Sequence, residues 1–306
     1  MTEARSAAGA HRHRRAKLTG IGWMLLTGVL FVGVTGIVRH LGSDMSPVQA
    51  AFIRYVFGLI LIAPVFFKLD LAALSRRSLG LYAARGLAHG IAVMLWFFAM
   101  ARIPIAEVTA IGFTAPIFTS LGAALFLGER LHSRRIGAIL IGFGGTMVIL
   151  RPGFQEIAPG ALAQLTAAPL FAISFLIAKK LTATQSSASI VAFLSIFVTL
   201  ALLPPALMVW RTPTVEELGW LLATATLATL GHYTLTRAFQ AAPITVTQPF
   251  SFLQLVWATL LGFYAFSEEP DLWTWAGAGI IVGSATYIAN REILRRGQAD
   301  PKPGPH

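Results

Sequence analysis

The chain has 306 residues, of which 56% are hydrophobic and only 12% are charged, and its formal net charge is +11. Soluble domains carry about 25% charged residues, so this composition argues against a soluble protein and favours a membrane protein. The basic residues form short clusters between apolar segments, which argues against nucleic acid as a partner and for contact with a lipid bilayer. The chain has no cysteine, which excludes disulfides and thiolate metal sites.

Ten apolar segments follow one another along the chain, separated by charged residues or by Pro and Gly. A helix that crosses a bilayer needs about 20 mostly apolar residues, and most of the segments approach that length. They cover residues 18–38, 47–67, 78–100, 103–127, 135–150, 160–178, 187–209, 217–238, 243–266 and 272–290. The sequence therefore predicts an all-α membrane protein with ten transmembrane helices.

A basic segment, residues 1–17, precedes the first apolar segment. The two together resemble a signal peptide in outline, but the run over residues 18–38 is too long for its apolar region and lacks a small-x-small cleavage site. We therefore expect a cytoplasmic basic tail followed by an uncleaved first helix. A second cytoplasmic tail, residues 291–306, is expected after the last helix.

The stretch from Ala99 to Arg151 recurs in altered form 139 positions later. Such self-similarity at a fixed period indicates an internal duplication. The period predicts two repeats of five helices, residues 18–150 and 160–290, joined by a linker at residues 151–159 that is broken by Pro and Gly. The matched pairs are Pro104 and Pro243, Phe113 and Phe252, Leu121 and Leu260, Glu129 and Glu268, Ile141 and Ile280, Gly144 and Gly283, and Ile149 and Ile288.

The distribution of Lys and Arg predicts the orientation. With the N-terminus in the cytoplasm, 18 of these residues lie in the tails and loops on the cytoplasmic side and four in loops on the outer side. This is a positive-inside pattern, and it predicts that both termini are cytoplasmic. Five helices are an odd number, so the second repeat would enter the membrane upside down. Inverted repeats of this kind place the solute site near the midplane between them.

The repeated stretch also resembles a known family. The pattern P-x-x-E/A, P-x-x and LGER within Pro104–Arg130, with its echo near Glu268, is similar to EamA-like members of the drug/metabolite transporter superfamily. The resemblance covers about residues 20–290. It implies a secondary transporter of the cell inner membrane whose central cavity opens to each side in turn. The second repeat departs from the pattern, because Ser267 replaces the glycine and Leu255 the mid-helix proline.

Several polar and aromatic side chains fall near the predicted midplane, and we expect them to contact the solute. His89 and His232 rank first, because histidine titrates near physiological pH. Trp96 could stack on a planar or cationic solute. The alternative is structural: the threonines would bond to their own helix carbonyls, and the aromatic stripe would be helix packing. The predicted contacts are His89, Trp96, Thr114, His232, Tyr233, Gln248, Ser251 and Gln254.

Three charged residues fall inside predicted helices, where ionisable groups are costly. Glu107 and Arg54 are expected at similar depths, close enough for a direct or water-bridged pair. In the functional interpretation Glu107 accepts a proton or attracts a cation in an outer vestibule; in the structural one the ion pair holds two helices together. Arg85 shares a helix face with His89.

Prolines inside helices remove a backbone hydrogen bond and can kink the helix, so Pro116, Pro169 and Pro249 are predicted hinges. The glycine-rich segments 135–150 and 272–290 contain few polar side chains. We expect them at the periphery, as a candidate homodimer contact.

The sequence thus predicts a secondary transporter that moves a small polar or aromatic-cationic metabolite by alternating access, with no cofactor, metal or catalytic residue. No G-x-x-x-x-G-K-[ST] motif of an ATP-driven pump occurs. Two alternatives remain. A flippase for a lipid or lipid-linked substrate would need a lateral opening lined by apolar residues. An integral membrane enzyme is less favoured, because neither H-E-x-x-H nor G-x-S-x-G is present.

Overall fold

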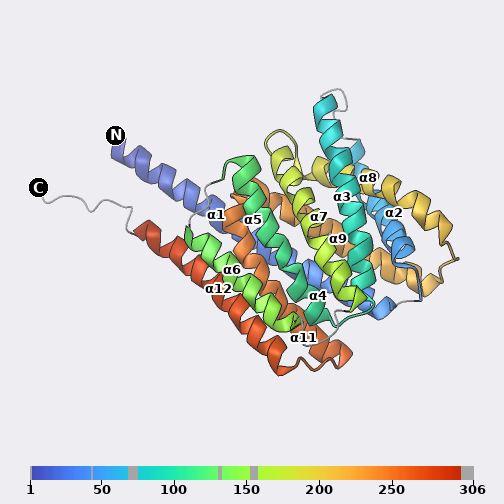
Figure 1. Cartoon of the computed structure of the whole chain (residues 1–306). Coiled ribbons are helices and arrows are strands. Elements are labelled where there is room, and N and C mark those ends of the chain that lie inside the picture. The colour runs from blue at the N-terminus through green and yellow to red at the C-terminus, as the bar shows by residue number, and fades with distance from the viewer. Residues whose placement is uncertain (1, 43, 68–74, 130–132, 152–157, 298–306) are drawn as a thin grey trace, which may run out of the picture.

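The computed structural model describes residues 2–42, 44–67, 75–129, 133–151 and 158–297, and all the regular secondary structure within them is helical (Figure 1). The first half of the chain forms α1 (Thr2–Leu41), α2 (Pro47–Phe66), α3 (Arg76–Met100), α4 (Ile105–Gly112), α5 (Thr114–Leu127) and α6 (Ser133–Leu150). The second half forms α7 (Pro159–Leu181), α8 (Ser187–Met208), α9 (Val215–Ala241), α10 (Ile244–Thr247), the 3-10 helix η1 (Gln248–Leu253), α11 (Gln254–Phe266) and α12 (Leu272–Gly297).

Local sequence signals set the starts of several helices. Pro47 and Pro159 begin α2 and α7, at the position where a missing N–H costs nothing. The hydroxyl of Ser75 accepts a hydrogen bond from a backbone N–H in the first turn of α3. Thr214 and Glu217 form a capping box at the start of α9.

Each of the ten apolar segments coincides with helix, but two of them are interrupted. The segment 103–127 divides at Phe113 into α4 and α5, and the segment 243–266 becomes α10, η1 and α11. α1 is continuous from Thr2, so residues 2–17 are helical and lead directly into the first apolar segment; α12 continues to Gly297, beyond the predicted end at residue 290. Most of the predicted linker, residues 152–157, lies outside the described residues.

Six helical segments of the described chain are long and apolar enough to cross a membrane. They are Ala16–Leu41, Pro47–Val65, Arg76–Met100, Ile105–Leu127, Pro159–Leu181 and Ser187–Met208. Large apolar side chains also cover the outside of the bundle: Phe126 and Tyr264 are 78% and 79% exposed. Apolar surface of this extent suits lipid as the solvent.

Helices from the two halves of the chain pack against each other throughout the bundle. α1 packs on α9, α3 on α7, α2 on α8, and α6 on α12. α6 and α12 lie along one edge, with α2 and α8 toward the opposite edge (Figure 1). α1, α3, α7 and α9 therefore form the centre, where four of the ten predicted spans meet.

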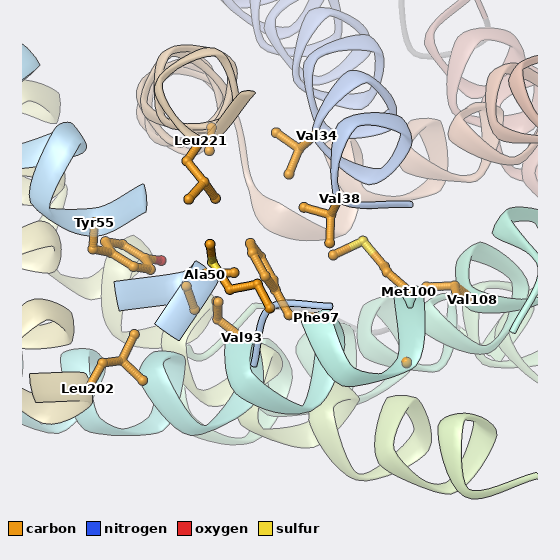
Figure 2. Close-up of a cluster of buried hydrophobic side chains, with 14 of the residues drawn as sticks. Val34, Val38, Ala50, Tyr55, Val93, Phe97, Met100, Val108, Leu202 and Leu221 are labelled. Carbon is orange, nitrogen blue, oxygen red and sulfur yellow. The ribbon is translucent and has the colours of Figure 1, made fainter. Parts of the chain in front are cut away.

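The largest buried apolar cluster joins the central helices to α2 and α8. Val34 and Val38 of α1 face Phe97 and Met100 of α3, and Leu221 of α9 closes the group (Figure 2). All five side chains are at least 96% buried. This cluster fixes α1, α3 and α9 relative to one another and so positions the residues of these helices that surround the cavity described next.

Candidate functional site

A cavity lies among the central helices, with about 140 Å³ of space for the centres of water-sized molecules. Its walls come from α1, α2, α3, α4, α5, α7, α9, η1 and α11, so both halves of the chain build it. The lining residues are Met24, Thr27, Gly28, Phe31, Thr35, Arg54, His89, Val93, Trp96, Val108, Thr109, Gly112, Phe113, Ala115, Gln164, Phe171, Phe175, His232, Leu235, Ser251 and Gln254.

Many of these positions are related by the period of the sequence repeat. Phe31 and Phe171 are 140 residues apart, and both line the cavity. Further lining pairs at offsets of 139 or 140 are Met24 and Gln164, Thr35 and Phe175, Val93 and His232, Trp96 and Leu235, Gly112 and Ser251, and Ala115 and Gln254. The same place in each repeat therefore faces the same space.

Aromatic rings form one continuous wall. The centroid of the Trp96 ring is 6.5 Å from that of Phe31 and 6.0 Å from that of Phe171, and both contacts are edge to face. His232 packs against Phe31 at 5.2 Å, and His89 packs against Phe171 at 5.1 Å. A wall of rings suits a flat, unsaturated solute, which can stack or make edge contacts with it.

Polar atoms without a hydrogen-bond partner in the described chain face the same region. They are Nε and Nη1 of Arg54, Nε2 of His89, Nδ1 of His232 and Oε1 of Gln164. The other ring nitrogen of His89 lies 3.0 Å from the hydroxyl of Ser174, which holds the ring in place. Buried polar groups normally have a partner, and these atoms can bind the polar groups of a ligand that enters the cavity.

The cavity has a basic character. Arg54 is only 4% exposed, and its guanidinium lies 3.9 Å from the centroid of the Tyr55 ring. Among the described residues no aspartate or glutamate lines the cavity. Since a buried positive charge attracts negative charge and hydrogen-bond acceptors, the lining does not favour a solute with a net positive charge.

The structure brings together most of the residues predicted from the sequence. His89, Trp96, His232, Ser251 and Gln254 all line the cavity. Gln248, Pro116 and Pro249 have side chains outside the described part of the structure.

Three other predicted residues lie elsewhere. The hydroxyl of Thr114 donates to the carbonyl of Ile111 (2.8 Å), which is the structural alternative. Tyr233 packs with a separate apolar cluster around Ile62. Arg85 is fully buried next to α8, where its Nη1 donates to the carbonyl of Ile190 (2.9 Å).

No ion pair joins Glu107 and Arg54, two residues that the structure describes, so the direct form of the expected pair is not present. Arg54 faces the cavity, whereas Glu107 is half-buried in α4 near the charges of Arg151 and Asp271. The sequence gives depth along a helix but not the direction in which the side chain points. α7 continues through Pro169 as one helix, so the hinge predicted there stays a prediction.

The lining residues that sequence reasoning missed include Phe31, Phe171, Phe175 and Gln164. Two of the aromatic residues, Phe31 and Phe171, occupy matched positions of the repeats, so the period of 140 could have found them. Gln164 lies about one turn after the start of α7, and a polar residue near a helix end gave no reason to expect it in the cavity.

The EamA-like transporter family matches this chain twice, over residues 18–151 and 158–290. The chain belongs to the EamA-like transporter family. This EamA-like transporter is 30% identical to an S-adenosylmethionine uptake transporter of Rickettsia felis, over 90% of this chain and 94% of the relative. It is 31% identical to a riboflavin transporter of Rhizobium johnstonii (91% and 93%) and 29% identical to one of Vibrio cholerae (91% and 95%).

A solved crystal structure has the same fold, with a TM-score of 0.68 at 19% identity over 94% of this chain and 99% of that one. The EamA-like protein is therefore a multi-pass inner-membrane transporter for a small metabolite, and not an enzyme. The flippase alternative is not favoured, because the named relatives carry metabolites.

Proposed function

We propose that this transporter moves a neutral or anionic, planar heteroaromatic metabolite with hydrogen-bond acceptors, through the cavity between its two repeats. The observation that supports this proposal most directly is the combination of an aromatic wall with the unpaired guanidinium nitrogens of Arg54. The substrate contacts we propose are His89, Trp96, His232, Ser251 and Gln254, together with Arg54 and Gln164.

The charge of the cavity lining distinguishes between the two solutes that are named for the relatives, riboflavin and S-adenosylmethionine. Riboflavin is uncharged, and its ring system has a flat face and one edge that alternates carbonyl oxygens with an N–H. Arg54 can donate to such an edge, and Oε1 of Gln164 can accept from it. S-adenosylmethionine also has a flat base, but its sulfonium and ammonium groups would meet Arg54 with no lining carboxylate in the described chain. A riboflavin-like solute fits this lining better.

Uptake by the purified protein in proteoliposomes tests this solute class. We expect saturable uptake of labelled riboflavin that empty liposomes lack and that the Arg54→Gln variant reduces at unchanged protein content. S-adenosylmethionine should compete weakly. Uptake of S-adenosylmethionine without uptake of riboflavin would overturn the proposed class, while leaving the transporter assignment in place.

We further propose ten transmembrane spans in two inverted repeats, residues 18–150 and 160–290, with both termini in the cytoplasm and alternating access between the repeats. The charge pattern of the loops, the 139-residue period and the matched lining positions support it. Cysteines placed at Ser133 and Ser267 should react with an impermeant maleimide from opposite sides of the membrane. Reaction from the same side would end the inverted arrangement.

A homodimer through α6 and α12 is also a proposal. Among the described residues, and apart from the backbone of its own helix, a Cβ at Gly144 or Gly283 would meet no atom within 4 Å, which leaves room for a second copy at these positions. Cysteine cross-linking at Gly144 in vesicles should yield a dimer, and a control cysteine at Leu207, exposed on α8, should not.

A further inference from the structure

Two glutamates make matching hydrogen bonds across the repeats. Oε1 of Glu129, directly after α5, accepts a hydrogen bond from the backbone N–H of Ile244, the first residue of α10 (3.1 Å). Oε2 of Glu268, directly after α11, accepts one from the N–H of Ile105, the first residue of α4 (2.9 Å). The two glutamates are 139 positions apart in the sequence, and so are the two isoleucines. Each glutamate therefore holds the start of the interrupted span of the other repeat.

The chain geometry that presents each carboxylate is also matched. Gly128 and Ser267 end α5 and α11 in the left-handed conformation, with φ of 68° and 51°. The residue after each, Glu129 or Glu268, returns its N–H to the helix that has just ended. This sharp turn directs the carboxylate back over the bundle instead of into solvent. Ser267 carries a Cβ in this conformation, which glycine adopts more easily.

A basic residue accompanies each carboxylate. Arg39, in the last turn of α1, lies 3.1 Å from Glu268. Lys179, in the last turn of α7, is 140 positions later; it donates to the carbonyl of Ala242 (3.0 Å) and is within electrostatic reach of Glu129. Both clusters therefore combine a carboxylate, a backbone N–H and a cation, so they are charge-assisted contacts of the stronger kind.

The two clusters lie at opposite ends of the cavity. α1 and α9 run antiparallel: His40, next to Arg39, packs on Trp220 at the start of α9, whereas Lys179 binds the carbonyl of Phe239 at its end. At 1.5 Å per residue, Trp220 and Phe239 are about 28 Å apart, close to the thickness of the hydrocarbon core. His232 and the cavity lie between them.

Each contact lies directly upstream of cavity-lining residues. Ile105 is one turn before Val108 and Thr109, and Ile244 begins the segment that continues to Ser251 and Gln254. Releasing a glutamate would therefore free the start of a segment whose next turns line the solute space. Spans broken into short helices can swing at the break, because no continuous hydrogen-bond ladder crosses it.

We infer that Glu129 and Glu268 are the positioning residues of two gates, each closing one end of the cavity by holding the broken span of the opposite repeat. This inference rests on the alternating-access mechanism proposed above. Both gates are engaged in this structure. Transport then requires that they release in turn: loss of the Glu268 contact opens the cavity at the Arg39 end, and loss of the Glu129 contact opens it at the Lys179 end.

Site-directed labelling can test the gates, because the chain contains no cysteine to remove. Single cysteines at Thr109 and Leu235, both in the cavity wall, are labelled with an impermeant maleimide from each side of oriented vesicles. We expect Glu268→Gln to raise labelling from the Arg39 side by about tenfold, and Glu129→Gln to do so from the Lys179 side, because the amide keeps an acceptor but loses the charge that strengthens the contact.

Glu269→Gln is the matched control, since it removes the same charge from an exposed neighbour of Glu268. It should label like the parent. If either gate variant fails to fold, judged by gel filtration, Arg39→Gln and Lys179→Gln replace it and should shift labelling to the same sides by a smaller factor. Labelling of both gate variants like Glu269→Gln would overturn the inference. The readout needs no solute, so failure of the proposed function shows separately, as absence of uptake by the parent protein.

Discussion

The imidazole rings of His89 and His232 meet nearly edge to face, with centroids 4.9 Å apart and an angle of 72° between their planes. One ring comes from α3 in the first half of the chain and the other from α9 in the second half. Each has one nitrogen without a hydrogen-bond partner in the described structure. The pair therefore joins the two halves at the cavity and leaves two polar atoms available to a solute.

Replacing His232 by phenylalanine keeps a ring of similar shape and removes the nitrogens. A hydrogen bond lost from a binding site costs about 1 kcal/mol, so the KM for the transported solute should rise about fivefold. Uptake in proteoliposomes measures it, and Tyr233→Phe on the same helix, packed outside the cavity, serves as the control. Equal KM values for His232→Phe and Tyr233→Phe would remove His232 from the solute site.

The two buried arginines should differ in what they affect. Arg54 faces the cavity, so Arg54→Gln should lower the rate of uptake at least tenfold and change the midpoint of thermal unfolding little. Arg85 donates to the Ile190 carbonyl between α3 and α8, so Arg85→Gln should lower the unfolding midpoint instead. Fluorescence-detected unfolding in detergent, measured alongside uptake, separates the two effects. A loss of stability in Arg54→Gln equal to that in Arg85→Gln would contradict the assignment.

Gly86 permits the close packing of α3 on α8. A Cβ at this position would lie 2.2 Å from Cβ of Phe197 and 3.0 Å from its backbone carbonyl carbon. Gly86→Ala should therefore destabilise the protein by about 1–3 kcal/mol through overpacking, because backbone cannot move aside as a side-chain end can. Gly80→Ala on the same helix, where a Cβ meets nothing within 4 Å, should leave the unfolding midpoint unchanged or higher. Similar midpoints for both variants would mean that α3 and α8 separate easily.

Asp271 provides a pH-dependent cap for α12. Partial burial raises the pKa of its carboxyl, but hydrogen bonds from the backbone and hydroxyl of Thr274 (2.8 and 2.7 Å) and the ion pair with Arg151 (2.8 Å) lower it more, so the pKa lies below the usual 3.8. A lowered pKa in the folded state stabilises the fold above the unfolded value. This stabilisation is lost as the pH falls from about 4 through the folded pKa.

The Asp271→Asn variant should lose the pH dependence in that range and keep much of the cap, since asparagine also caps helices. Unfolding midpoints between pH 3 and 7 in detergent measure this. Parallel curves for the parent and Asp271→Asn would show that Asp271 makes no such contribution.

The helices follow from local features that the sequence carries directly. Apolar runs require helices, because no other open structure satisfies its backbone in lipid, and Pro47, Pro159 and the Thr214–Glu217 box mark where helices begin. Counting along those helices predicts that His89 and His232 lie near the midplane. The resemblance to the EamA-like family rests on the repeated motif and was confirmed.

Local sequence features do not predict the direction in which a side chain points or the contacts between segments that are distant in the chain. Arg54 and Glu107 are expected at similar depths, yet Arg54 of α2 faces the cavity, whereas Glu107 of α4 lies near the charges of Arg151 and Asp271. For the same reason Gln164 was missed, because its position along α7 does not show that its side chain faces the cavity.

The sequence by itself determined the class of protein, the helical segments, the 139-residue period and the transporter family, because each depends on composition, on local hydrogen bonding or on motifs in the chain. Only the tertiary structure decided that Glu129 holds Ile244 and Glu268 holds Ile105, 115 and 163 residues away in the chain. Such contacts arise from how helices rotate and pack, and these are set by the whole core, including the cluster of Val34, Phe97 and Leu221 (Figure 2).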